Sequence, residues 1–207
     1  MQLDAARVNR TWAMAKEIEA KFRLADPGGL RARLAALGAV RSGRVLETNR
    51  IFDTPEGRLR QAGCGLRVRT CRPWPEGGAA VPTETTGGML TFKGPRAAGA
   101  LKSREELETE LCDPAAAVSI LQRLNLREVI VYEKRRETWR LGELEVALDE
   151  LPRLGSFVEI EGPTEDAVQG ARRELGLADE PLVSETYVHL VAAHGQLTED
   201  GRRQLLF

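Results

Sequence analysis

The chain has 207 residues, 42% of them apolar, which is enough for one substantial hydrophobic core and does not require a second domain. Its 30 Lys and Arg residues almost cancel its 31 Asp and Glu residues. A formal net charge of -1 is a poor match for a protein that coats nucleic acid or an anionic membrane, although it is compatible with a local basic pocket.

The three cysteines, Cys64, Cys71 and Cys112, form no CxxC pair and leave an odd thiol, which is typical of a reducing compartment. No apolar run approaches the length of a membrane span, and the amino terminus lacks a secretory signal. We therefore expect a cytoplasmic protein without a nucleic-acid or membrane partner. Residues 1–13 are polar and aperiodic, and we expect them to be a disordered extension.

The first predicted strand, residues 17–24, alternates charged and apolar side chains. The charged face carries two acids followed by two bases, namely Glu17, Glu19, Lys21 and Arg23. This order fits either an ordinary solvated sheet face or a metal ion bound to a polyanion, which needs carboxylates with cations beside them.

Further strands and helices follow, separated by Gly and Pro turns. The predicted strands after the first are 45–53, 66–69, 89–93, 101–111, 129–141, 143–150 and 157–161. The predicted helices are 30–37 after an Asp26 cap, 114–124, 165–175, and one from a Ser184 cap to about His194. Residues 73–88 read as a long loop, either a lid or an ordinary insertion.

About eight strands and four helices without strict alternation predict an α+β protein with a mainly antiparallel sheet. Open sheets of this size tend to curl. If the eight strands close into a barrel, their charged faces turn inward while helices cover part of the apolar outside. Residues 14–195 would form this single domain, and residues 196–207 a C-terminal tail.

The distribution of charge along the strands favours a site over a solvated surface. Carboxylate pairs occupy the first strand (Glu17, Glu19) and the last (Glu159, Glu161), whereas cationic pairs occupy the middle. We expect the first and last strands to meet only if the sheet closes. Closure would then gather four carboxylates, which is costly unless a divalent cation lies among them.

These residues resemble a known family. Glu17-x-Glu19-x-Lys21 is similar to the ExExK motif of the CYTH superfamily, the triphosphate tunnel metalloenzymes, which include class IV adenylate cyclases and thiamine and inorganic triphosphatases. The resemblance covers roughly residues 15–191. It continues through Phe52-Asp53-Thr54-Pro55, Leu66-Arg67-Val68-Arg69, Thr91-Phe92-Lys93-Gly94-Pro95, Arg104-Glu105-Glu106, Glu133-Lys134-Arg135-Arg136, Leu148-Asp149, Phe157-Val158-Glu159-Ile160-Glu161 and Ser184 to Leu190.

Two departures from the family pattern are Asn49-Arg50-Ile51, where the family often has Asp-x-Tyr, and the separation of Ser184 from Tyr187. We therefore leave Asn49 and Tyr187 out of the predicted catalytic set. The resemblance implies a mainly antiparallel, closed eight-stranded β-barrel flanked by helices. Its tunnel would bind a small-molecule triphosphate with Mg²⁺ or Mn²⁺, and a homodimer stays open.

Site residues follow from the resemblance position by position. The implied metal ligands are Glu17, Glu19, Asp149, Glu159 and Glu161. The implied phosphate-binding residues are Lys21, Arg67, Arg69, Lys93, Arg104, Lys134 and Arg136, with Asp149 and Lys21 as the catalytic pair. Glu106 and Glu108 are weaker candidates that orient the basic residues by ion pairing.

Three functions stay open at this point. The first is a metal-dependent hydrolase of inorganic or nucleoside triphosphates. The second is a class IV adenylate cyclase, which uses the same phosphate grip but lets the ribose 3′-hydroxyl attack the α-phosphorus. The third is a non-catalytic polyphosphate or nucleotide sensor, although an anion binder gains little from clustered acids.

Overall fold

The computed structural model describes residues 18–78, 81–82, 85, 87–95 and 105–207. This part of the chain forms one ten-stranded sheet with five α-helices. The strands are β1 (Ile18–Arg23), β2 (Val40–Asp53), β3 (Gly65–Pro73), β4 (Gly88–Lys93), β5 (Glu106–Leu111), β6 (Arg127–Leu141), β7 (Leu144–Leu151), β8 (Gly155–Gly162), β9 (Gln196–Leu197) and β10 (Arg203–Leu205). The helices are α1 (Pro27–Ala36), α2 (Arg58–Gln61), α3 (Pro114–Arg123), α4 (Glu165–Glu174) and α5 (Tyr187–His194).

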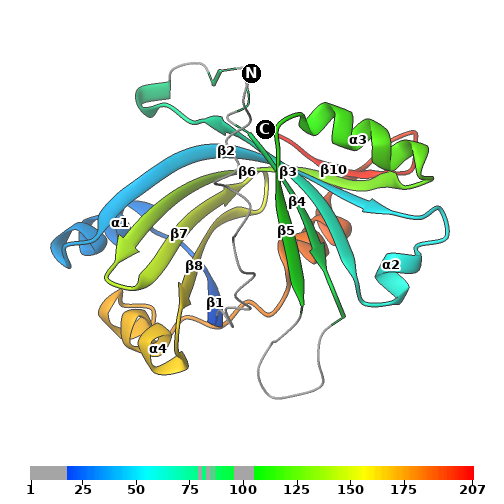
Figure 1. Ribbon diagram of the computed structural model, residues 1–207. Coiled ribbons are helices and arrows are strands. Elements are labelled where there is room, and N and C mark those ends of the chain that lie inside the picture. Colours follow the sequence, from blue (N-terminus) through cyan, green and yellow to red (C-terminus); the bar gives the residue numbers. More distant parts are fainter. Residues whose placement is uncertain (1–17, 79–80, 83–84, 86, 96–104) are drawn as a thin grey trace, which may run out of the picture.

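The sheet is arched rather than closed. Its strand order is β1-β8-β7-β6-β2-β3-β4-β5, and every pairing along this path is antiparallel. Figure 1 shows β1, β8 and β7 on one side of the arch and β3, β4 and β5 on the other. Within the described residues the end strands β1 and β5 do not pair, so the mainly antiparallel sheet is confirmed but the closed barrel is not.

The central strands are longer than the described parts of the end strands. The central strands β2 and β6 have 14 and 15 residues, whereas β1 and β5 have six each. Because neighbouring strands twist relative to one another, the two halves of the sheet diverge along this long central pair.

The first strand meets its partner without closure, which corrects our expectation. β1 pairs directly with β8, with Lys21 opposite Glu159 and Glu19 opposite Glu161. These two strands are distant in sequence but adjacent at one edge of the sheet. The acidic residues are therefore gathered by a local pairing, and a closed barrel is not needed for it.

Three helices cover the outer face of the sheet and explain the strict alternation in the strands. Phe22 and Val158 pack with Leu34 of α1 and Val168 of α4 in one cluster of buried residues. On the other half, Leu121 of α3 packs with buried residues of β2 and β3. Because alternate side chains point to opposite faces, the charged residues of the same strands turn to the opposite, inner face.

Helix α5 instead packs against residues of the inner face. Its N-cap is Thr186, whose hydroxyl accepts a hydrogen bond from the amide of His189, and not Ser184 as predicted. Val191 of α5 is buried in a cluster that includes Phe157 and Leu205. Residues 196–207, predicted as a tail, contribute β9 and β10, and β10 runs parallel to β6. No helix in the described part of the chain is long and apolar enough to cross a membrane.

Candidate functional site

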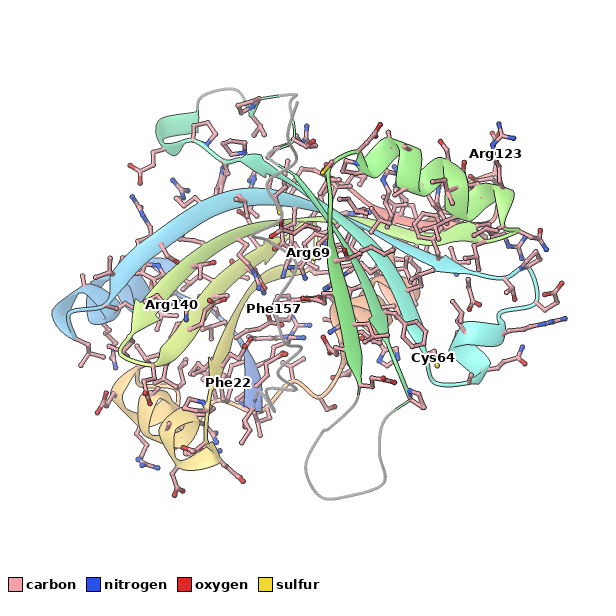
Figure 2. The ribbon with its side chains drawn as sticks, viewed as in Figure 1. Phe22, Cys64, Arg69, Arg123, Arg140 and Phe157 are labelled. Atoms are coloured by element: carbon pink, nitrogen blue, oxygen red, sulfur yellow. The ribbon has the colours of Figure 1, made fainter. Side chains whose placement is uncertain are left out.

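The candidate site is the inner face, defined by Lys21, Glu47, Arg67, Arg69, Lys134, Arg136, Asp149 and Glu159. These side chains come from β1, β2, β3, β6, β7 and β8. Seven of them are connected by hydrogen bonds and ion pairs, whereas Arg67 contacts Thr91 and Glu108. In Figure 2, Arg69 and Phe157 lie between the two halves of the arch, whereas Arg123 and Arg140 lie at its periphery. The structure therefore brings together residues that the sequence distributes over more than 130 positions.

Asp149 is the central acid of the inner face. Its Oδ2 accepts hydrogen bonds from Lys134 Nζ at 3.1 Å, from Arg136 at 2.6 Å and from the Tyr187 hydroxyl at 2.8 Å, while Oδ1 accepts one from Arg136 Nε at 2.7 Å. Burial alone raises the pKa of Asp149, but Arg136 and Lys134 outweigh burial and hold it well below its ordinary value. Asp149 is thus an ionised anchor for two cations.

Glu47 is a second buried acid, from β2, which the sequence reading missed. Its carboxylate lies 3.4 Å from Lys134, 3.5 Å from Arg69 and 4.0 Å from Arg136. Burial raises the pKa of Glu47, yet these three cations outweigh it and lower the pKa to about 2. Glu47 and Asp149 together hold Arg69, Lys134 and Arg136 in fixed positions through ion pairs.

Lys21 and Arg136 connect these cations to Glu159 on β8. Lys21 Nζ lies 3.1 Å from a carboxylate oxygen of Glu159, and Arg136 donates a short hydrogen bond to the other. The pKa of Glu159 is lowered, because Lys134, Arg136 and Lys21 together outweigh its burial and the charge of Asp149. Glu159 is therefore ionised at neutral pH.

The β3, β4 and β5 half of the inner face carries two further cation–acid contacts. Arg67 donates to the Thr91 hydroxyl at 3.3 Å, and Thr91 in turn donates to Glu108 at 2.7 Å. Lys93 pairs with Glu106 at 2.6 Å. These contacts match the expectation that Glu106 and Glu108 orient basic residues. Arg67 Nε is buried and makes no hydrogen bond with the described residues, which leaves a donor for an anion.

The acidic edge has the donor chemistry of a divalent-cation site. Glu161 lies between Glu19 on β1 and Glu145 on β7, directly opposite both, so three carboxylates form a row across the strands. Desolvation and the neighbouring Glu159 raise the pKa of Glu19. Like charges in register are destabilising, and oxygen ligands of this kind suit Mg²⁺ or Mn²⁺. Among the described residues, no three His, Cys, Asp or Glu side chains converge as a preformed metal cluster, so the fit is one of donor type and charge.

Two predicted site residues, Glu17 and Arg104, lie outside the described residues. The structure places the other ten on the inner face or at its acidic edge. Sequence reasoning missed Glu47 and passed over Tyr187 and Asn49. Asn49 is fully buried, and its side-chain oxygen accepts a hydrogen bond from Arg69 Nε at 3.3 Å. The signal that could have found Glu47 is its spacing of two from Asn49, which puts both on one face of a strand.

Comparison with known proteins identifies the family. The model of the CYTH domain matches residues 15–187. The chain belongs to the CYTH family. Adenylate cyclase CyaB of Aeromonas hydrophila is 31% identical over 83% of this chain and 86% of its own length.

Solved structures share the fold of this CYTH protein. A protein from Pyrococcus horikoshii OT3 is 26% identical, with a TM-score of 0.67, over 84% of this chain and 98% of its own. The protein HpAC1 from Hippeastrum, described as having a dominant triphosphatase activity, is 21% identical, with a TM-score of 0.60, over 86% of this chain and 95% of its own.

Proposed function

We propose that this CYTH protein is a metal-dependent hydrolase of inorganic or nucleoside triphosphates. One observation carries the proposal: a group of cations, fixed on the buried acids Glu47 and Asp149, lies beside a row of carboxylates on the same face of the sheet. A polyanion that carries a divalent cation is complementary to both parts of this face.

The cationic part would bind the phosphate oxygens. Arg67, Arg69 and Arg136 keep partial exposure, and arginine presents a planar fork that matches phosphate oxygens. Lys21 and Lys134 are almost fully buried, with 7% and 3% of their side-chain surface exposed, and add two point charges. Phosphoryl transfer depends mainly on positioning and on charge neutralisation, which such fixed cations supply.

The acidic part would hold Mg²⁺ or Mn²⁺ through Glu19, Glu159 and Glu161, with Glu17 as a further predicted ligand. When bound, the ion would neutralise phosphate charge and favour attack on phosphorus. In the proposed reaction, water attacks the terminal phosphorus and the bond from that phosphorus to the bridging oxygen breaks. Orthophosphate and the remaining diphosphate or nucleoside diphosphate leave, and the water's proton passes to solvent. We assign Lys134, Arg136 and Lys21 to stabilising the charge that develops on the phosphate oxygens.

Adenylate cyclisation is the second candidate, because the Aeromonas hydrophila relative is named an adenylate cyclase. It would use the same cations for the triphosphate of ATP. The ribose 3′-hydroxyl would attack the α-phosphorus, and pyrophosphate would leave. HpAC1, which shares the fold, is described with a dominant triphosphatase activity. Family membership is therefore compatible with either outcome.

The discriminating experiment is a product assay. The protein is incubated with ATP or tripolyphosphate and Mg²⁺ or Mn²⁺, and orthophosphate, pyrophosphate and cyclic AMP are quantified. Metal-dependent release of orthophosphate from either substrate supports the proposal, and cyclic AMP with equimolar pyrophosphate from ATP replaces it with the cyclase. If no product forms while tripolyphosphate binds, the protein is a sensor.

A further inference from the structure

Tyr187, the first residue of α5, meets both buried lysines of the inner face. Its side chain is buried, and its ring packs edge-on against Phe157 with centroids 5.5 Å apart. Lys21 Nζ lies 4.0 Å from the Tyr187 ring centroid and Lys134 Nζ lies 4.9 Å from it. Because β8 and β7 lie between β1, which carries Lys21, and β6, which carries Lys134, the ring is a direct physical link between the two lysines.

The tyrosine is itself held at both ends. Its hydroxyl donates to Asp149 at 2.8 Å, and its backbone begins a helix that Thr186 caps. A buried tyrosine hydroxyl needs such a partner, and Asp149 is already fixed by Arg136. The orientation of the ring is therefore set by the same acid that orients the cations.

Lysine has a flexible four-carbon side chain, so an ammonium group needs several contacts to occupy one position. Lys134 contacts Asp149 and Glu47, and Lys21 contacts Glu159 and the backbone oxygen of Glu185. Each ammonium group therefore has one hydrogen-bond acceptor and one further carboxylate beside it, and it carries three N–H donors. The face of an aromatic ring attracts a cation without using an N–H donor in a directed hydrogen bond.

We propose that Tyr187 is a positioning residue whose ring face holds Lys21 and Lys134 in place for a bound triphosphate. This inference rests on the proposed function of the same site. The ring restricts both ammonium groups while leaving each an N–H donor for a phosphate oxygen. α5 therefore acts on the phosphate-binding residues through one side chain, without itself contacting the ligand.

Two substitutions separate the ring from the hydroxyl. Tyr187→Phe keeps the ring face and removes the hydrogen bond to Asp149, and Tyr187→Leu removes the ring face while keeping an apolar side chain. We expect Tyr187→Leu to weaken tripolyphosphate binding and to lower kcat/KM by about tenfold to a hundredfold, from two lost cation–ring contacts. Tyr187→Phe keeps the ring but loses the hydrogen bond that orients it, so we expect a smaller loss, of about twofold to fivefold, than for Tyr187→Leu.

Val191→Ala is the matched control for loosening α5. Val191 is fully buried in the same cluster as Tyr187, but it has no aromatic ring that could contact Lys21 or Lys134. Binding of tripolyphosphate is measured by calorimetry, alongside kcat, KM and thermal stability, at a temperature where all variants are folded. A tenfold higher dissociation constant for Tyr187→Leu supports the inference, provided that the dissociation constant of Val191→Ala stays near that of the unchanged protein.

The same measurements can overturn it. Equal tripolyphosphate affinity and equal kcat/KM for Tyr187→Leu and the unchanged protein would refute the positioning role and leave the proposed function standing. Equal losses for Tyr187→Leu and Val191→Ala would reduce Tyr187 to a structural role. Failure of the unchanged protein to bind tripolyphosphate would refute the proposed function itself.

Discussion

Substitution of Glu47 by Gln tests whether the buried acids hold the cations of the inner face. Glu47 is 2% exposed and faces three cations within 4.0 Å. Those cations lower its pKa from an ordinary value of 4.5 to about 2. A difference of about 2.5 in pKa corresponds to about 3 kcal/mol of folding free energy from ionised Glu47.

The lowered pKa of Glu47 makes the folding stability depend on pH. Because the pKa is lower in the folded state, this stability is fully present above pH 4.5 and is lost as the pH falls towards 2. Glu47→Gln should therefore lower the free energy of unfolding by about 3 kcal/mol at pH 7. The difference between the two proteins should shrink by about 1.4 kcal/mol per pH unit below pH 4.5.

The assay is equilibrium unfolding in urea at pH values from 7 to 3 for both proteins. Glu76→Gln is the control, because Glu76 is 63% exposed and its ion pairs with Arg41 and Arg44 lie at the surface. That control should change stability by less than about 1 kcal/mol. A Glu47→Gln effect that is below 1 kcal/mol at pH 7, or that is the same at pH 7 and pH 3.5, would refute the reasoning.

Three further predictions concern phosphate binding, the metal and the core. Arg67→Ala should lower kcat/KM for tripolyphosphate by at least about tenfold through loss of a charge-assisted contact. Arg123→Ala, at the exposed end of α3, is the control and should not lower it; equal effects would contradict the assignment of Arg67 to phosphate binding. Glu19→Gln should abolish metal-dependent turnover and the thermal stabilisation by Mn²⁺. Because the pKa of Glu19 is raised on folding, its ionisation costs folding stability as the pH rises above 4.5. Without metal, Glu19→Gln should therefore be no less stable at pH 7 than the unchanged protein, and a marked loss of stability would argue against crowding of the acids. Phe22→Ala should cost about 3–5 kcal/mol in urea unfolding, since Phe22 is fully buried between β1 and the outer helices; a cost under 1 kcal/mol would mean that this cluster is not a core.

Local pattern was sufficient to predict most elements and the facing of their side chains. The alternation in residues 17–24 predicted that Lys21 and Phe22 would lie on opposite faces of a strand, and the structure has them so, with Phe22 in the outer core. Asp26, Asp113 and Thr164 each cap the helix that was predicted after them. The N-cap of α5 was misplaced by two residues, because Ser184 and Thr186 are chemically equivalent capping residues.

Two residues of the inner face, Glu47 on β2 and Tyr187 on α5, could not be found from the sequence pattern. Glu47 and Asn49 share the inner face with the apolar Val45 and Ile51, so no charged stripe marks that strand. Tyr187 lies 38 residues from its hydrogen-bond partner Asp149, and nothing in the residues around it indicates that contact. Such contacts depend on tertiary packing rather than on spacing along one element.

The sequence by itself determined which residue types share a strand face, since side-chain alternation is a local property of the backbone. From that pattern and the family resemblance follow the paired carboxylates, the cationic strands and the expectation of a triphosphate. Tertiary structure decided which strands are neighbours, and so that β1 meets β8 at an open edge instead of across a closed barrel. It also decided that Glu47, Asp149 and Tyr187 all contact Lys134, because convergence of distant strands and a helix depends on how the long central strands twist and pack.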